Sequence, residues 1–222
     1  MVASGGRVFP QVLEEVIQLG FEHCSFGMMA PLPLTAPRVA WRSNYPPEWC
    51  QRYQDRDYVG IDPTLLHAVQ STRAIRWTDD LFQDCPDFRA AARSFGLIHG
   101  LTQPHRDDKG MVSVLNVSRA APLIEATEWK SKIAALQQLA YRCHEDMRSE
   151  WRGLLLTQAR ALVEREIEVL RWAAEGKTSA DSARLLGIKE STVNFHIRSA
   201  CAKMGTASKT AAAAQAAVLG LL

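Results

Sequence analysis

The sequence lacks any apolar run of the roughly 18 residues that a membrane-spanning helix requires, and even its Ala-rich tail falls short of that length. Its first ten residues contain neither the uninterrupted apolar stretch nor the small-residue cleavage site of a secretory signal. We therefore expect a cytoplasmic protein with no membrane partner.

Cysteines are few, odd in number and widely scattered. No C-x-x-C pair occurs among Cys24, Cys50, Cys85, Cys143 and Cys201. This distribution argues against a disulfide framework and against a zinc site. We expect the five side chains to be small buried hydrophobes, and we predict neither a metal nor a cofactor.

The length of 222 residues predicts two domains, and the overall net charge of +2 conceals a local basic excess. Between residues 177 and 209 the acidic residues are Asp181 and Glu190 only. The basic residues of the same stretch are Lys177, Arg184, Lys189, Arg198, Lys203 and Lys209. Such an excess fits a polyanion partner, although a solvated helical surface accounts for it about equally well.

Helical and strand-like patterns mix in the first 150 residues. Hydrophobic periodicity predicts helices over 9–19, 46–54, 62–71, 86–95 and 125–151, and strands over 23–30, 38–43, 97–105 and 110–119. The last strand is apolar on both faces, which indicates a sheet covered on both sides, by helices on one face and by a ligand on the other. The fold class is therefore α+β, with an N-terminal α/β/α sandwich sensor domain built on an antiparallel sheet.

Four short helical patterns follow, over 164–174, 178–186, 190–204 and 208–219. We place a ligand-binding domain at 1–152, a linker at 153–161 and an all-α four-helix domain at 162–222. Gly187 can adopt a positive φ in the tight turn between the second and third of these helices. That spacing predicts a helix-turn-helix.

The third helix has a face suited to DNA. Val193, Ile197, Ala200 and Met204 share one side and are expected to pack inward. The opposite side carries Asn194, Phe195 and Arg198, whose groups can hydrogen-bond base edges or contact a thymine methyl. Phosphate contacts are expected from Ser191, Thr192, His196, Lys177 and Lys203. The alternative is one more packed amphipathic helix.

An aromatic set with one carboxylate stands out in the first domain. Trp49 and Tyr53 are one helical turn apart, and Tyr45, Asp62 and Trp77 lie nearby in the sequence. Taken singly, each of these aromatic residues is more typical of a hydrophobic core than of a ligand site. A buried carboxylate beside them is costly unless something donates to it, and the amide N–H of a ligand would do so.

The second domain resembles the LuxR-type DNA-binding domain. The resemblance is carried by Leu162-Val163-Glu164-Arg165-Glu166, Val169-Leu170, Ala174-Glu175-Gly176-Lys177-Thr178, Ser191-Thr192-Val193, His196, Lys203-Met204 and the closing Leu219-Gly220-Leu221-Leu222. It implies a homodimer on a pseudo-palindromic site in double-stranded DNA, with Asn194, Phe195 and Arg198 reading bases. Val163, Asp181-Ser182-Ala183 and Asn194 depart from the family pattern, which leaves the target sequence open.

Residues 21–117 resemble the autoinducer-binding domain of quorum-sensing LuxR proteins, which bind N-acyl-homoserine lactones. Ser25-Phe26-Gly27, the stretch from Pro31 to Pro37 and the stretch from Ser43 to Trp49 are most similar to orphan receptors that lack a partner synthase. The resemblance implies that Trp49 donates to the lactone carbonyl, Asp62 accepts the ligand amide N–H and Tyr45 donates to the acyl carbonyl.

Further residues are carried over by the same resemblance. It implies that Tyr53 and Trp77 wall the pocket, with Ser25 also at the ligand. Further family positions, near the lactone end or needed for close packing, are matched by Phe88, Ala92, Gly96 and Gly100, of which Phe88 and Ala92 are counted with the ligand-binding residues. Asn116 departs from the family, which has Ser or Thr contacting the ligand there, and its larger amide bears on acyl-chain preference. The chain starts inside or just before the first helix of the family's domain, so the sequence leaves open the contacts that this segment makes in the family.

The sequence thus predicts a ligand-responsive transcription regulator of quorum sensing. One alternative is a ligand-independent or antagonist regulator whose pocket is filled by side chains. A remote alternative is a lactone or amide hydrolase that uses Asp62 with His67 or His99, or Cys24 as nucleophile. No G-x-S-x-G or H-E-x-x-H pattern occurs, and we therefore expect no enzyme activity.

Overall fold

The computed structural model of the chain describes residues 8–29, 39–108, 110–156 and 162–222. The chain divides into two compact units, the first made of most residues up to Glu150 and the second of Trp151–Leu222. Among the described residues no helix has the length and apolar character that crossing a bilayer demands. Each unit is described below by itself.

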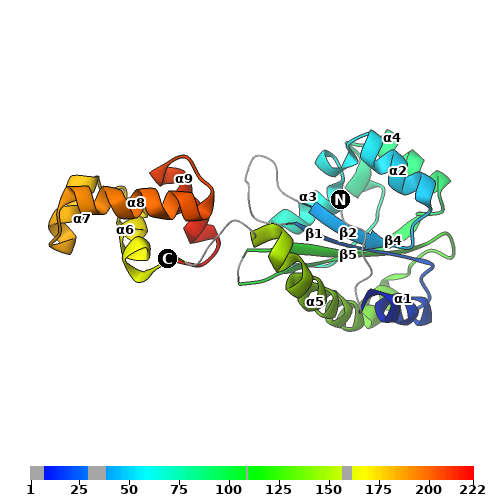
Figure 1. Cartoon of the computed structure of the whole chain (residues 1–222). Helices are drawn as coiled ribbons and strands as arrows, with labels where there is room; N and C mark the ends of the chain where they lie inside the picture. The colour runs from blue at the N-terminus through cyan, green and yellow to red at the C-terminus, as the bar shows by residue number, and fades with distance from the viewer. Residues whose placement is uncertain (1–7, 30–38, 109, 157–161) are drawn as a thin grey trace. The chain divides into compact units, whose positions relative to one another are not determined.

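The first unit is built on a five-stranded antiparallel sheet with the strand order β2-β1-β5-β4-β3. The strands are β1 (His23–Met29), β2 (Val39–Ser43), β3 (Ile75–Arg76), β4 (His99–Arg106) and β5 (Val112–Arg119). Helices α1 (Phe9–Gln18) and α5 (Ala126–Leu156) cover one face, as Figure 1 shows. Helices α2 (Pro47–Asp55), α3 (Pro63–Gln70) and α4 (Pro86–Ser94) lie over the other. This confirms the α/β/α sandwich.

Strand β5 lies in the middle of the sheet, and all eight of its residues are buried. Successive side chains of a strand point to opposite faces. Leu115 and Val117, at 1% and 0% exposure, therefore lie on the face of α1 and α5, because Val114 and Asn116 line a cavity on the other face. The prediction that this strand is covered on both sides is confirmed.

Most predicted elements begin and end within two residues of the observed ones. The prediction for the last helix of the unit was wrong at its end, because α5 continues to Leu156 into the first residues of the predicted 153–161 linker. Residues 30, 38 and 157–161 of the predictions lie outside the described part of the chain. The short elements β3, η1 (Tyr58–Gly60) and η2 (Asp80–Phe82) were not predicted.

The cysteine prediction is correct in part. All five thiols are free, and Cys24 and Cys143 are buried in the apolar interior. Cys50, Cys85 and Cys201 are partly exposed, so the expectation of burial was wrong for these three. Cys50 and Cys201 lie within helices, and Cys85 immediately precedes one. The position of a lone cysteine in a sequence does not reveal whether its side chain faces the core.

The second unit contains α6 (Glu164–Ala174), α7 (Ser179–Leu186), α8 (Glu190–Met204) and α9 (Lys209–Val218). Gly187 caps α7 with a φ of 65°, a conformation that glycine adopts without strain, and so turns the chain into α8. A core of Leu170, Ala200, Met204 and Ala216 joins α6, α8 and α9. The four-helix domain with its helix-turn-helix is as predicted.

Candidate functional site

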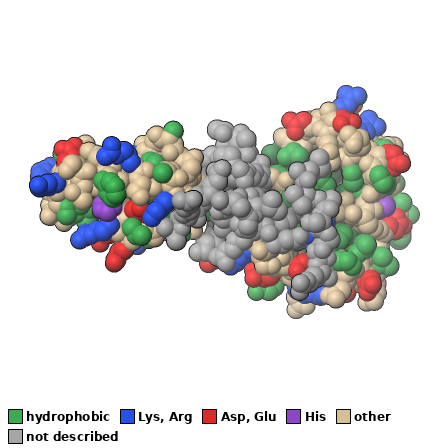
Figure 2. All heavy atoms as spheres, in the orientation of Figure 1, with side chains coloured by type: hydrophobic (Ala, Val, Ile, Leu, Met, Phe, Trp, Pro, Cys, Tyr) green, Lys and Arg blue, Asp and Glu red, His purple; other side chains and the backbone are tan. Residues whose placement is uncertain are grey.

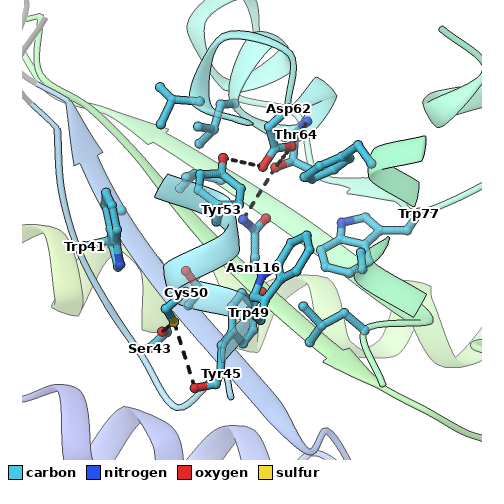
Figure 3. Close-up of a pocket in the computed structure, with 18 of the residues that line it drawn as sticks. Trp41, Ser43, Tyr45, Trp49, Cys50, Tyr53, Asp62, Thr64, Trp77 and Asn116 are labelled. Atoms are coloured by element: carbon cyan, nitrogen blue, oxygen red, sulfur yellow. Dashed lines mark hydrogen bonds between the residues drawn. The ribbon is translucent and has the colours of Figure 1, made fainter. Parts of the chain in front are cut away.

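A cavity lies in the first unit between the sheet and the helices α2 to α4 (Figure 3). Its empty volume is about 790 Å³, which includes solvent at the opening. Every residue predicted to bind the ligand lines it, namely Ser25, Tyr45, Trp49, Tyr53, Asp62, Trp77, Phe88, Ala92 and Asn116. Their individual roles stay predictions.

The floor of the cavity includes a polar row that crosses four strands. Ser43 pairs with Ser25, Ser25 with Asn116, and Asn116 with Thr102 in the antiparallel register. Directly opposed residues share a face of the sheet, so these four side chains are neighbours. Three of them, Ser43, Ser25 and Asn116, line the cavity.

Helix α2 contributes an aromatic wall. Trp49 and Tyr53 are four residues apart, and their ring centroids lie 5.8 Å from each other. The Trp49 ring also contacts Phe88 of α4 at 5.7 Å and is only 3% exposed. No hydrogen bond of its indole N–H is present within the described residues, so this donor remains available to a ligand.

Asp62 both lines the cavity and caps α3. Its Oδ1 accepts hydrogen bonds from the backbone N–H of Thr64 at 2.8 Å and from the hydroxyl of Thr64 at 2.7 Å. Its Oδ2 accepts one from the hydroxyl of Tyr53 at 2.9 Å. Burial raises the pKa of Asp62 above its ordinary value, although these donors oppose the rise. The protein itself therefore offsets much of the cost of burial that sequence reasoning assigned to a ligand.

A chain of hydrogen bonds connects the cavity's polar residues. The indole N–H of Trp77 donates to Thr102 Oγ1, and Thr102 donates to Asn116 Oδ1, both at 2.7 Å. Asn116 Nδ2 lies 3.5 Å from Thr64 Oγ1, whose proton goes to Asp62. Sequence reasoning missed Thr64 and Thr102. The Asp-Pro start of α3 was a signal for Thr64, whereas Thr102 had none beyond strand alternation.

Tyr45 enters the cavity from the segment before α2. Its side chain hydrogen-bonds with Ser25, and burial raises the pKa of Tyr45 well above its ordinary value. The hydroxyl therefore stays protonated at neutral pH and can donate. Beside it, Cys50 Sγ lies 3.7 Å from Ser43 Oγ (Figure 3).

The outward face of α8 carries the residues predicted to read DNA. Phe195 is 61% exposed, Arg198 is exposed and Asn194 is half-buried, while Val193, Ala200 and Met204 are buried as predicted. Of the predicted phosphate contacts, Ser191 and Lys177 are exposed, and Thr192 and His196 are half-buried. Figure 2 shows Lys and Arg side chains spread over the visible face of this unit.

Lys203 differs from the other predicted phosphate contacts. Its Nζ lies 2.8 Å from Oε2 of Glu166, a carboxylate only 2% exposed that also accepts from Ser199 at 2.6 Å. Burial alone would raise the pKa of Glu166, but the hydrogen bonds from Lys203 and Ser199 hold it below its ordinary value. Lys203 thus joins α8 to α6, a structural role that its charge did not reveal.

Two family models match the sequence. Residues 7–147 match the autoinducer binding domain, and residues 160–216 match the bacterial regulatory proteins of the luxR family. The chain belongs to the LuxR family. Its resemblance to LuxR-type quorum-sensing regulators is thereby confirmed.

Similar proteins span the whole chain. The transcriptional activator protein AnoR of Acinetobacter nosocomialis is 34% identical over 225 residues, which cover 100% of this chain and 94% of AnoR. The regulatory protein SdiA of Escherichia coli is 34% identical over 97% of this chain and 90% of its own length. A structure of SdiA in complex with octanoyl-rac-glycerol has a TM-score of 0.83 at 34% identity and covers 96% of this chain and 88% of that one.

LuxR-family proteins are ligand-responsive transcription regulators that bind DNA, and not enzymes. The geometry agrees with this for the hydrolase alternative. Cys24 is fully buried, burial raises the pKa of its thiol well above the ordinary value, and the ring of His67 is hydrogen-bonded to the carbonyl of Arg73. Asp62 accepts hydrogen bonds from Thr64 and Tyr53, and within the described residues no hydrogen bond or ion pair joins it to a histidine.

Proposed function

We propose that this LuxR-family regulator senses an N-acyl-homoserine lactone in the cavity of its first unit. The observation that carries the proposal is the convergence of Tyr45, Trp49 and Asp62 on one cavity with apolar walls. An acyl lactone has an apolar chain, a planar amide and a ring carbonyl.

Each polar group of the ligand has a matching side chain. The indole N–H of Trp49 donates to the lactone carbonyl, and the protonated hydroxyl of Tyr45 donates to the acyl carbonyl. Asp62 Oδ2 accepts one hydrogen bond within the described residues and has capacity for the ligand amide N–H. Tyr53, Trp77, Phe88, Ala92, Ser25 and Asn116 complete the ligand set.

An acyl glycerol is the second candidate ligand, because a solved structure of the similar protein SdiA is in complex with octanoyl-rac-glycerol. An acyl glycerol is an ester and has no amide N–H, although its two free hydroxyls can donate. In the lactone the N–H is fixed next to the acyl carbonyl, whereas a glycerol hydroxyl must lose rotational freedom to reach Asp62, so we expect the lactone of the same chain length to bind more tightly.

The ligand-independent alternative needs a pocket filled by the protein's own side chains. An open cavity among the residues predicted to bind the ligand favours ligand binding instead. Binding free energy then adds to the stability of the folded unit as RT ln(1 + [L]/Kd), about 4 kcal/mol at a thousandfold excess over Kd.

At the DNA, α8 enters the major groove with Asn194, Phe195 and Arg198 toward the bases. Phosphate contacts come from Ser191, Thr192, His196 and Lys177. Lys203 donates to Glu166 of α6 and so holds α8 against that helix. The regulator acts as a cytoplasmic homodimer, so its two recognition helices are one helical turn of DNA apart, about 34 Å, on a pseudo-palindromic site.

Thermal unfolding of the full chain tests the proposal. The melting temperature is measured against increasing N-octanoyl-homoserine lactone and, in parallel, against 1-octanoyl-rac-glycerol. A concentration-dependent rise that is larger for the lactone supports the proposal. A larger rise for the glycerol ester assigns the cavity to the second candidate, and no rise with either overturns ligand sensing by this cavity.

A further inference from the structure

A buried histidine joins α5 to the sheet on the face opposite the cavity. His144 of α5 is 0% exposed, and both of its ring nitrogens have partners. Nδ1 lies 2.8 Å from the hydroxyl oxygen of Ser113 on β5. Nε2 lies 3.3 Å from Oδ2 of Asp107, which directly follows β4. None of these three residues lines the cavity, so the cluster is separate from the ligand site.

The two partners of His144 require a neutral ring. An ionised carboxylate only accepts, so Nε2 carries the ring proton and donates to Asp107. Nδ1 is then the acceptor, and the hydroxyl of Ser113 donates to it. Ser113 is buried, and its hydroxyl has no second acceptor within the described residues. A second ring proton, on Nδ1, would therefore leave the hydroxyl proton of Ser113 without an acceptor.

A second histidine opposes a positive charge at the same place. His105 of β4 pairs with Ser113 in the sheet, and its ring centroid lies 4.6 Å from that of His144. Burial and the nearby His105 lower the pKa of His144 below its ordinary value, although Asp107 opposes the fall. Burial also lowers the pKa of His105. The closed cluster therefore keeps both rings neutral at neutral pH.

The other charged and titratable groups near the His144 ring come from α5 and from the residue after β4. They are Asp107, Tyr141, Glu145 and Arg148. The two carboxylates favour a charged ring, but Arg148 lies 3.6 Å from Asp107 and 3.5 Å from Glu145. On α1, Glu15 is paired with Arg142 of α5. The carboxylates around the ring thus already have a permanent cation as partner.

Asp107 connects the histidine to the hairpin between β4 and β5. Its Oδ1 accepts from the backbone N–H of Met111 at 2.8 Å, and its own N–H donates to the carbonyl of Met111. The cluster therefore fastens the C-terminal half of α5 to the end of this hairpin. Along the chain, α5 continues to Leu156 and precedes the four helices of the second unit.

We propose that Asp107, His144 and Ser113 form a pH-sensitive latch, which holds the C-terminal half of α5 on the sheet at neutral pH, opens in mild acid and thereby weakens DNA binding. A histidine released from the cluster is protonated below about pH 6.5, whereas the closed cluster keeps the ring neutral. Opening therefore takes up a proton, and the stability of the closed latch is lost as pH falls through about 6.5. The inference adds protons as a second input and does not depend on which ligand fills the cavity.

Hydrogen exchange of the full chain, without added ligand, measures opening of the latch. The readout is the protection factor, the ratio of the intrinsic to the observed exchange rate, which removes the effect of pH on the exchange chemistry itself. For the amides of residues 139–149 it should fall about threefold to tenfold between pH 7.5 and 5.5, because each opening takes up one proton. The amides of β1 should keep their protection.

His144→Gln is the central variant, because a glutamine amide can donate to Asp107 but does not titrate. Its protection factor over residues 139–149 should be the same at both pH values. Should this variant not fold, His105→Gln provides the second test, and its fall should be smaller than in the wild type because the opposing ring is gone. His67→Gln is the matched control, since His67 is half-buried on α3 and lies outside the cluster, and it should show the wild-type fall.

Affinity for a DNA site selected by the wild type from random sequences measures the regulatory effect. The rise in dissociation constant from pH 7.5 to 5.5 should be about fivefold or more larger in the wild type than in His144→Gln. Comparing the two variants cancels the titration of His196, a predicted phosphate contact. An unchanged protection factor over residues 139–149 overturns the latch, as does an equal loss over β1. The same rise in both variants overturns its effect on DNA binding.

Discussion

Gly100 makes room for the indole ring of Trp77. A Cβ atom at position 100 would lie 2.3 Å from Cδ2 and Cε3 of Trp77, far inside van der Waals contact. The ring therefore packs directly against the backbone of strand β4, and the indole N–H of Trp77 donates to Thr102 on the same strand. The size of one residue thus sets the position of the cavity wall and of the hydrogen-bond chain that begins there.

Gly100→Ala is expected to displace Trp77 and weaken ligand binding. Overpacking of this kind costs about 1–3 kcal/mol of folding free energy, which urea unfolding measures. The lactone-dependent rise in melting temperature should shrink as well, because the cavity wall moves. Gly60→Ala is the control, since a Cβ there has nothing within 4 Å. Equal behaviour of the two variants would contradict the proposed role of Gly100.

Asp62 has two functions that substitutions can separate. Asparagine caps helices as well as aspartate, so Asp62→Asn should change the free energy of unfolding by less than about 1 kcal/mol. Its amide no longer offers a charged acceptor, and lactone affinity should fall about tenfold or more. Asp62→Ala removes the cap and should cost about 0.5–2 kcal/mol of stability besides. Retention of lactone affinity in Asp62→Asn would show that the carboxylate serves α3 alone.

Arg198 and Lys203 lie on the same helix but should act differently. Arg198→Met is expected to leave the unfolding transition unchanged and to cost about 1–3 kcal/mol in binding to a DNA site selected by the wild type from random sequences. Lys203→Met leaves buried Glu166 without its ion pair and should lower the stability of the second unit by about 3 kcal/mol or more. An unaltered melting temperature for Lys203→Met would contradict this structural role of Lys203 and leave only the phosphate contact predicted from the sequence.

Acid should weaken the first unit through Glu128. The hydrogen bonds from Arg119, at 2.7 Å to each carboxylate oxygen, and from Lys132 lower the pKa of Glu128 to about 2. A carboxyl with a lowered pKa stabilises the fold above its ordinary pKa, and this stability is lost as pH falls toward the lowered value. Urea unfolding of the wild type should therefore lose stability progressively between pH 5 and 2.

Glu128→Gln should cost about 1–3 kcal/mol at pH 7, because Arg119 is buried and loses its partner. The difference from wild type should shrink as pH falls. Glu14→Gln is the control, since Glu14 is exposed on α1. A pH-independent difference between wild type and Glu128→Gln would rule out the ion pair as its source.

Much of the fold could be predicted because local patterns and tertiary structure agree. The periodicity of α8 buries Val193, Ala200 and Met204 as its sequence requires, and Gly187 turns the chain before it. Strand β3 was not predicted because two residues are too few to show a hydrophobic period, and the strand exists only through its pairing with β4.

The hydrogen bonds within the cavity were harder to predict than the residues that line it. The sequence pattern singled out Tyr45, Trp49 and Asp62, and the resemblance to a family supplied their ligand roles. The hydrogen-bond chain depends on register between strands, which a sequence does not display. Thr102 joins it only because β4 pairs Thr102 with Asn116. The ion pair of Lys203 with Glu166 could not be predicted, because a charge in a sequence does not reveal its partner.

The most direct measurement of the whole account is the affinity of the full chain for its selected DNA site, at fixed salt, with and without saturating N-octanoyl-homoserine lactone. If ligand binding in the cavity controls the regulator, the dissociation constant for DNA changes about tenfold or more in the wild type, and the change is lost in Asp62→Asn. An identical dissociation constant with and without lactone, for a protein that demonstrably binds the lactone, would contradict the account.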